Sequence, residues 1–171
     1  RHGNTTGGPL PWEKFAAAVE LLKTTGDTRY AKAVSDIWPE IAKDFAPNAI
    51  TAAEALPLMP ATYRQAMEPV VRQWVRESNE AIAGNPYGVP ITEGGWAGNG
   101  TVIGYGLATD ALHRAFPDIV KQDGVFRALS YLLGNHPGSD ISFVSGVGSR
   151  RCRGSRTGRR CGCPIRPTRS C

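Results

Sequence analysis

The chain has 171 residues, of which 41% are hydrophobic and 20% are charged, as in one ordinary globular domain. No apolar run approaches the ~20 residues that a membrane-spanning helix needs, so we expect no membrane partner. The opening residues, RHGNTTGGPLPW, lack Met and the apolar core of a signal peptide. Because the pattern opens abruptly, we expect the chain to be a fragment.

The net charge of +5 is divided unevenly along the chain. Residues 150–171 hold eight Arg and all four Cys, with no Lys and no acidic residue, which leaves residues 1–149 with a net charge of −3. A mildly acidic body argues against a nucleic-acid surface, and we expect no specific nucleic-acid partner. We therefore predict a folded body over 1–149 and an Arg/Cys-rich tail over 150–171.

Two helices joined by a tight turn are predicted at the start of the body. The first begins near Pro11 and ends at Gly26. Asp27 or Thr28 caps the second helix, which continues through Pro39 as one kinked helix. Apolar residues recur every three or four positions: Trp12, Phe15, Val19 and Leu22 in the first helix, and Tyr30, Val34, Ile37, Ile41 and Phe45 in the second.

Three further helices are predicted, over about 61–83, 101–116 and 119–133, with Gly134 ending the last. Trp38 and Trp74 lie within helices and are expected in the core. Gly104 and Gly106 each weaken their helix by ~1 kcal/mol relative to Ala, which indicates close packing against a neighbour or a ligand. The predicted inward residues of the helix over 61–83 are Tyr63, Met67, Val70, Trp74 and Ile82, and those of the helix over 119–133 are Val125, Leu129 and Leu132.

Strand-like alternation occurs only over residues 141–144, where a short strand is predicted. The fold class is therefore all-α, built from helical hairpins with tight turns. Two connections, 83–100 and 134–149, are too long to be simple turns, and loops of this length are usually functional or disordered. Tyr87 and Trp96 stand among the glycines of the first connection, which favours a functional loop.

Three phrases of the sequence carry a family resemblance: FAAAVELLKTTGDTRYAKAV, NPYGVPITEGGWAGNGTVIGYGLATDAL and RALSYLLGNHPGSDISFVSGVG. In this order they resemble glycoside hydrolase family 9, the inverting cellulases and related β-glucanases, over about residues 9–148. The last phrase is the most specific. The resemblance implies an (α/α)6 barrel of six helical hairpins with an open cleft, and the five predicted helices look like its second half without the final helix.

The resemblance also implies hydrolysis of β-1,4-linked glucan by an Asp pair in an early segment and a general-acid Glu in a late one. Inversion needs both carboxylates, about 6.5–9.5 Å apart. This chain matches neither segment, so we assign no catalytic residue and expect it to be inactive alone. Asp36/Glu40 and Glu77/Glu80 have helical spacing and are expected on solvated surfaces, and only Glu93 lies beside cleft-like residues.

Sugar binding is the part of the family's function that this chain can retain, because an indole stacks on the apolar face of a pyranose ring. Trp96, in GGWAGNG, matches the family loop whose Trp forms a glucose platform, and Trp12 matches a Trp that opens another cleft-side helix. Asn99 and Tyr87 could supply hydrogen bonds. The alternatives are core packing for Trp12 and a structural anchor of the loop for Trp96.

The histidines suggest no catalysis: His113 is expected on the surface near the end of its helix, His136 is expected to structure its loop, and His2 lies in a frayed terminus. The sequence contains no metal-binding or phosphate-binding motif, so we expect neither metal nor cofactor. The expected partner is a β-linked glucan or oligosaccharide. The resemblance implies secretion and a monomeric full-length protein.

The tail loses all resemblance to the family beyond Gly148. Its Arg, Gly, Pro, Ser and Cys composition is typical of GC-rich coding DNA read in a wrong frame, and it offers almost nothing to bury, so we expect it to be disordered or out of frame. An Arg-rich arm, paired disulfides and a zinc site are the alternatives.

The function as a whole also has an alternative, a non-enzymatic helical-hairpin scaffold or binding module with a basic tail. The hydrolase hypothesis leaves four substrates possible: cellulose, mixed-linkage glucan, xyloglucan and amino-sugar oligomers. It also leaves both endo and exo action possible. The glycine-rich aromatic loop favours the hydrolase, because a scaffold does not require such a loop.

Overall fold

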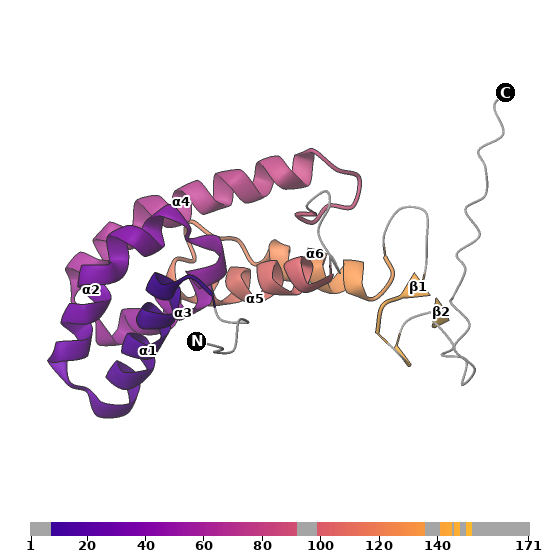
Figure 1. The fold of residues 1–171 in the computed structure, drawn as a ribbon. Coiled ribbons are helices and arrows are strands. Elements are labelled where there is room, and N and C mark those ends of the chain that lie inside the picture. Colours follow the sequence, from indigo (N-terminus) through magenta and orange to yellow (C-terminus); the bar gives the residue numbers. More distant parts are fainter. Residues whose placement is uncertain (1–7, 92–98, 136–140, 145, 148–149, 152–171) are drawn as a thin grey trace, which may run out of the picture. The chain divides into compact units, whose positions relative to one another are not determined.

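The structure is a computed structural model that describes residues 8–91, 99–135, 141–144, 146–147 and 150–151. The chain divides into two compact units, Arg1–Leu129 and Ser130–Cys171. Helices dominate the described residues, which confirms the all-α class (Figure 1). The elements are α1 (Leu10–Thr25), α2 (Thr28–Lys43), η1 (Ala46–Asn48), α3 (Ala49–Ala55), η2 (Leu56–Leu58), α4 (Ala61–Ala83), α5 (Asn99–Ala115), α6 (Asp123–Leu132), β1 (Ile141–Ser142) and β2 (Arg150–Arg151).

The turn between α1 and α2 is formed as the sequence predicts. Gly26 adopts a left-handed conformation, φ 66°, and its N–H donates to the carbonyl of Leu22 at 2.9 Å. Asp27 is the residue that caps α2, because its carboxylate accepts a hydrogen bond from the backbone N–H of Arg29 at 2.8 Å. Both ends of the turn therefore satisfy backbone groups that a helix terminus leaves unpaired.

Helix α2 runs through Pro39 as one helix, as predicted, and ends at Lys43. Its buried residues, Val34, Trp38 and Ile41, belong to one core cluster with the buried face of α1. Phe45 lies just beyond α2 and is 6% exposed, so the predicted apolar stripe continues past the end of the helix, although Tyr30 and Ile37 within it are only half-buried.

The predicted set of five helices misses one, because α3 forms between residues 46 and 58. Its two flanking 3-10 turns each contain a proline near the start. The helix packs against α1 and α5 through small side chains, and a face of alanines shows no clear apolar stripe in the sequence. The buried residues of α3 are Ala49, Ala52, Ala53 and Ala55.

Helix α4 has the predicted bounds and continues through Pro69. Of its predicted inward residues, Tyr63, Met67 and Trp74 are buried, Val70 and Ile82 are half-buried, and the neighbouring Val71 is fully buried instead. This face of α4 is covered by other described helices: Tyr63 meets Trp38 of α2 edge to face, with ring centroids 5.0 Å apart.

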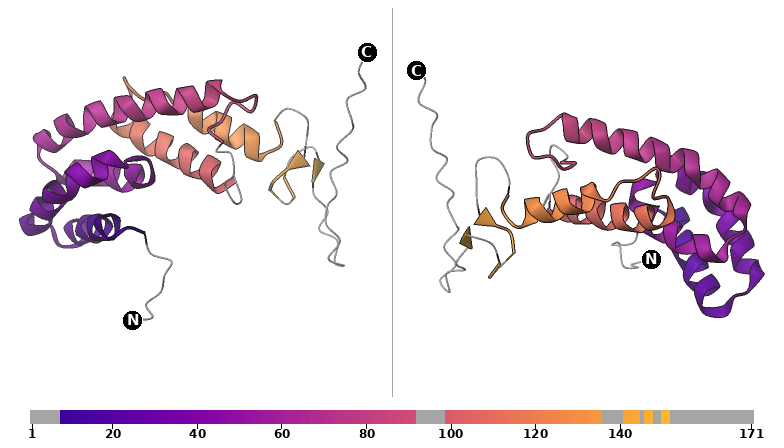
Figure 2. Two further views of the ribbon diagram at one scale, coloured as in Figure 1. Left: turned by 45° about the horizontal axis from the view of Figure 1, so that its top comes forward. Right: turned by 180° about the vertical axis from the view of Figure 1, so that it is seen from behind.

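Helices α5 and α6 lie beside each other (Figure 2). A Cβ atom at Gly106 of α5 would lie 3.0 Å from the Cβ atom of Ala128, so the predicted close packing at this glycine is confirmed. Helix α6 begins at Asp123 rather than near residue 119, because the backbone of Ile119 bonds back to Phe116 in a turn. Leu129 is 51% exposed, which corrects its predicted inward position.

In the second unit, β1 covers the first half of the predicted strand and pairs in parallel with β2, Ile141 opposite Arg150. The backbone N–H of Phe143 donates to the carbonyl of Leu132 at 2.9 Å, and the hydroxyl of Ser142 donates to the same carbonyl at 3.3 Å. Arg150 and Arg151 thus stand in a strand at the start of the predicted tail. Residues 152–171 lie outside the described residues.

Candidate functional site

The connection that follows α4 begins with a turn built around Asn85. The side-chain amide of Asn85 donates to the carbonyls of Ala81, at 2.6 Å, and Val89, at 2.9 Å. Its side-chain oxygen accepts a hydrogen bond from the backbone N–H of Tyr87 at 2.9 Å. Val89 is fully buried, and Gly88, with φ 70°, allows the chain to turn toward it. The side chain of Tyr87 is left 40% exposed at the surface.

The residues predicted to bind sugar lie on two parts of the fold. Tyr87 precedes and Asn99 follows residues 92–98, and Asn99 is the half-buried first residue of α5. Trp12 lies in the first turn of α1, where its half-buried ring packs on the core cluster. Trp96 and Glu93 lie outside the described residues. Tyr87 and Asn99 therefore flank one connection, whereas Trp12 packs with the helices of the core.

A hollow of about 440 Å3 borders the same connection. We call it the loop-side hollow. Pro90 and Thr101, from the two flanks of the connection, both line it, together with Glu77 and Ser78 of α4. Gly104 lines it as well, and a Cβ atom placed there would meet no described atom within 4 Å. Of the two glycines singled out in this helix, Gly106 packs against a helix, whereas Gly104 faces open space.

A stacked aromatic pair borders the loop-side hollow. The rings of Trp74 and Tyr105 have centroids 5.8 Å apart and an interplanar angle of 30°. The same pair borders a second hollow of about 300 Å3. Burial raises the pKa of Tyr105, and the nearby Asp123 carboxylate acts in the same direction. Its hydroxyl is therefore protonated at neutral pH and can donate a hydrogen bond.

Trp74 is 7% exposed and Trp38 is 8% exposed, which confirms the predicted core positions of both residues. The sequence did not predict that Trp74 would also border two hollows. It lies four positions from Ser78 on α4, and helical spacing of this kind is the same for a core residue and for one that lines a hollow. The sequence does not show the space between α4 and α5, because that space depends on tertiary structure alone.

The described carboxylate pairs with helical spacing lie on the surface, as predicted. Asp36 forms an ion pair with Lys32 at 2.6 Å, and Glu40 pairs with Lys43 at 2.8 Å. Glu77 and Glu80 are both exposed, although Glu77 also reaches the loop-side hollow, where its carboxylate accepts a hydrogen bond from the amide of Gln73 at 2.6 Å.

His113 was expected on the surface, and the structure corrects this. Its ring is half-buried, and Nδ1 lies 2.8 Å from the carbonyl oxygen of Val120. The residue thus ties α5 to the turn that precedes α6. His2 and His136 lie outside the described residues. Across the described ranges, no three His, Cys, Asp or Glu side chains gather in a group that could hold a metal ion.

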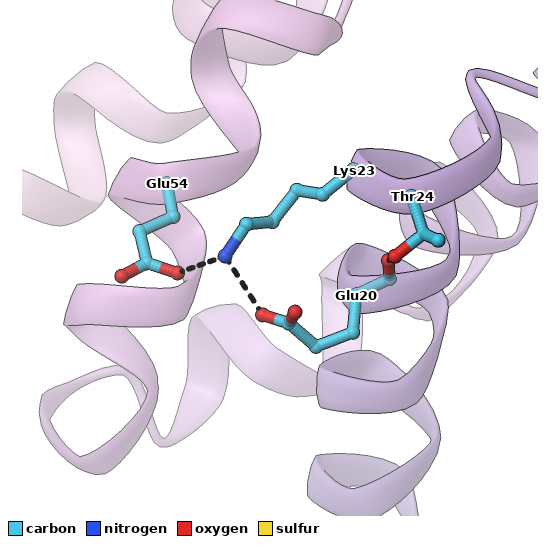
Figure 3. A network of polar contacts seen from close by, with 4 residues as sticks. All are labelled: Glu20, Lys23, Thr24 and Glu54. Atoms are coloured by element: carbon cyan, nitrogen blue, oxygen red, sulfur yellow. Dashed lines mark hydrogen bonds and ion pairs between the residues drawn. The ribbon is translucent and has the colours of Figure 1, made fainter.

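A third hollow, of about 610 Å3, lies between α3, α5 and the beginning of α4. Glu54 stands at its rim and links α3 to α1 through Lys23 (Figure 3). The ammonium of Lys23 lies 3.0 Å from Glu54 and 2.8 Å from Glu20. The hydrogen bond to Glu20, followed by the one to Glu54, raises the pKa of Lys23.

None of the helices in the described part of the chain is both long enough and apolar enough to cross a membrane. A scan against protein-family models finds no match to this chain, and comparisons with curated proteins and with solved structures find no match either.

Proposed function

We propose that this chain is part of a secreted, inverting β-1,4-glucan hydrolase, and that it binds glucan at the connection between α4 and α5 without the carboxylates needed for hydrolysis. The all-α body and the tight α1–α2 hairpin support an (α/α)6 architecture, because that barrel is assembled from such hairpins. On this proposal, the end of α4 and the beginning of α5 form one side of the cleft.

The position of the loop-side hollow is the observation that carries the proposal. Pro90 and Thr101 both line the hollow, and they follow closely on Tyr87 and Asn99, two of the three described residues that the sequence assigns to sugar binding. Both residues thus lie within three positions in the chain of a residue that lines the hollow, whose size suits a small ligand.

The lining of the hollow suits a pyranose ring. Trp74, Tyr105 and Pro90 offer apolar surface, which favours the C–H faces of a sugar. Ser78 and Thr101 offer hydroxyls, and the Glu77 carboxylate offers acceptors for sugar hydroxyls. An apolar floor with a few polar groups is the usual composition of a small-molecule site.

Titration of cellotetraose into the purified chain, followed by tryptophan fluorescence, tests the proposal, because Trp74 borders the hollow. We expect a saturable change at millimolar sugar. Gly104→Leu fills the open space and is expected to weaken binding by about tenfold. Ala66→Leu adds the same side chain on the exposed face of α4, away from the hollow, and is expected to leave the affinity unchanged.

A flat response from a chain that melts cooperatively would refute glucan binding. Equal weakening by Gly104→Leu and Ala66→Leu would move the site away from the loop-side hollow. The proposal also predicts no turnover of a chromogenic cellobioside, because the early Asp pair and the late Glu act as a unit and are missing. Turnover that follows the purified chain through a second chromatographic step would contradict that part.

A further inference from the structure

The hollow between α3, α5 and α4 differs from the loop-side hollow in its lining. Its floor is aliphatic, formed by Ile50 and Leu56 on one side and by Leu107 and Ala111 of α5 on the other. Its volume of about 610 Å3 lies within the range of small-molecule sites. Leu107 is 57% exposed, so the hollow is open to solvent at that end.

The two ends of the hollow differ in polarity, because its lining changes along α5. From Leu107 to Ala115 the helix advances by about 12 Å, and the lining changes from aliphatic side chains, past the ion pair of Asp110 with Arg114, to the guanidinium group of Arg64. A ligand that follows the helix would therefore meet apolar surface first and positive charge last.

The charges that line the hollow do not all cancel. Arg114 is paired with Asp110 at 2.7 Å, and Glu54 is paired with Lys23. The exposed Arg64 instead donates one hydrogen bond to the carbonyl of Ala115, at 2.5 Å. No ion pair joins Arg64 to any carboxylate among the residues that the structure describes. This guanidinium is the lining charge that a ligand can neutralise.

Arg64 is also held in place. Its guanidinium carbon lies 4.4 Å from the centroid of the Phe116 ring, and the bond to Ala115 anchors one end of the fork to the last turn of α5. A guanidinium has five N–H groups in a rigid plane, so the remaining donors can receive a carboxylate in bidentate fashion at little further cost in side-chain entropy.

We propose that this hollow binds a small aliphatic carboxylate, with the carboxylate on Arg64 and the hydrocarbon chain along α5 toward Leu107. The aliphatic floor supplies apolar contact, and the one unneutralised guanidinium at its end selects an anion over a neutral molecule of equal length. The site is independent of glucan binding, since none of these residues lines the loop-side hollow.

Calorimetric titration of octanoate into the full chain tests the site, with octanol and acetate as probes that carry only the hydrocarbon chain or only the charge. We expect octanoate to bind at least about tenfold more tightly than either probe, a difference of about 1.4 kcal/mol. Arg64→Gln should reduce octanoate affinity to that of octanol and leave octanol unaffected. Arg72→Gln, on the same helix but paired with Glu68, should change neither.

A second pair of variants locates the hydrocarbon chain. Leu107→Glu places a negative charge at the open end of the hollow and should weaken octanoate binding. Ile103→Glu makes the same change one turn earlier on α5, at a residue that is 45% exposed and does not line the hollow, and should have no effect. Both sites are exposed, so both variants are expected to fold.

Equal affinity for octanoate and octanol, or octanoate binding that survives Arg64→Gln, would overturn the role of Arg64. Equal effects of Leu107→Glu and Ile103→Glu would overturn the placement along α5. Displacement of octanoate by cellotetraose would show a shared site and overturn the independence from glucan binding, whatever the outcome of the glucan titration itself.

Discussion

The α1–α2 hairpin and the α4–α5 pair each bury apolar faces of two successive helices, but the second pair also borders two hollows. In α1 and α2, Phe15, Val19 and Val34 are fully buried around a two-residue turn. Between α4 and α5, hollows lie at the stacked pair of Trp74 and Tyr105. The contrast teaches that similar apolar periodicity can produce a closed core or an open one.

Side-chain size and connection length account for the difference. A short turn holds α1 and α2 together at close range, and bulky side chains fill the contact. Apart from Tyr105, the face of α5 toward the loop-side hollow carries Thr101, Gly104 and Ala108, which are too small to fill the space left by a long connection. Packing in a closed core is dense, whereas ligand-sized space remains in this open region.

The largest expected effect is on the free energy of unfolding when one tryptophan is removed from each of the two regions. Trp38→Ala should lower the free energy of unfolding by about 3–5 kcal/mol, because Trp38 meets Phe45 and Tyr63 edge to face. Trp74→Ala should cost less, because part of the Trp74 ring already borders open space. Urea denaturation of both variants measures the difference, and equal losses would remove the contrast between closed and open packing.

A smaller effect is expected where α5 and α6 cross. A Cβ atom at Gly124 would lie 2.5 Å from the Tyr105 hydroxyl oxygen and 3.1 Å from Cγ2 of Thr109. Gly124→Ala should therefore lower the free energy of unfolding by about 1–3 kcal/mol through overpacking. Adding Tyr105→Phe removes the nearest atom and should recover part of the loss. An unchanged free energy of unfolding in Gly124→Ala would show that α5 and α6 can move apart at little cost.

Gly104→Ala should raise the free energy of unfolding, whereas Gly124→Ala lowers it. The new methyl group meets no described atom within 4 Å, and Ala is favoured over Gly inside a helix by about 0.5–1 kcal/mol. The melting temperature should rise slightly, in contrast to Gly124→Ala. A fall would mean that the loop-side hollow is filled in solution.

The smallest effect concerns the ion pairs of Lys23, which lie at the exposed surface. The pKa of Lys23 is raised above its ordinary value of 10.5 by Glu20 and Glu54. Its contribution to stability is therefore fully present below that value and is lost as the pH rises through the pKa of the folded state. Lys23→Met should be slightly less stable than the parent protein at neutral pH. The two should be equally stable at a pH above the pKa of Lys23 in the folded state. Urea midpoints measured across the alkaline range check this, and a difference that persists at high pH would contradict it.

Much of the helical framework follows from the sequence. Large apolar residues at helical spacing, Gly26 and Asp27 define the first hairpin, and α4 has the predicted bounds. Helix α3 escapes prediction because its buried face is made of alanines, which give a weak periodic signal. The beginning of α6 is displaced because Ile119 continues an apolar pattern but bonds back to Phe116 as a turn.

The candidate site is less predictable than the fold. The unusual composition of the connection, which is a local property, singles out Tyr87, and Asn99 is added only with the family resemblance. The loop-side hollow depends on the distance between α4 and α5, so Trp74 and Ser78 look like any residues on an inward helical face. Arg64 is missed for a related reason, since its value as an anion site comes from Ala115 and Phe116, about fifty residues away in the chain.

In the proposed function, the side chain of Asn85 affects the rate at which a ligand associates. Its amide joins the last turn of α4 to Val89, and its oxygen holds the backbone at Tyr87. The conformational freedom of this segment is therefore lost when the chain folds rather than when a ligand arrives. A ligand that contacts Tyr87 meets a preorganised backbone, and replacing Asn85 should slow association without removing any group that touches the ligand.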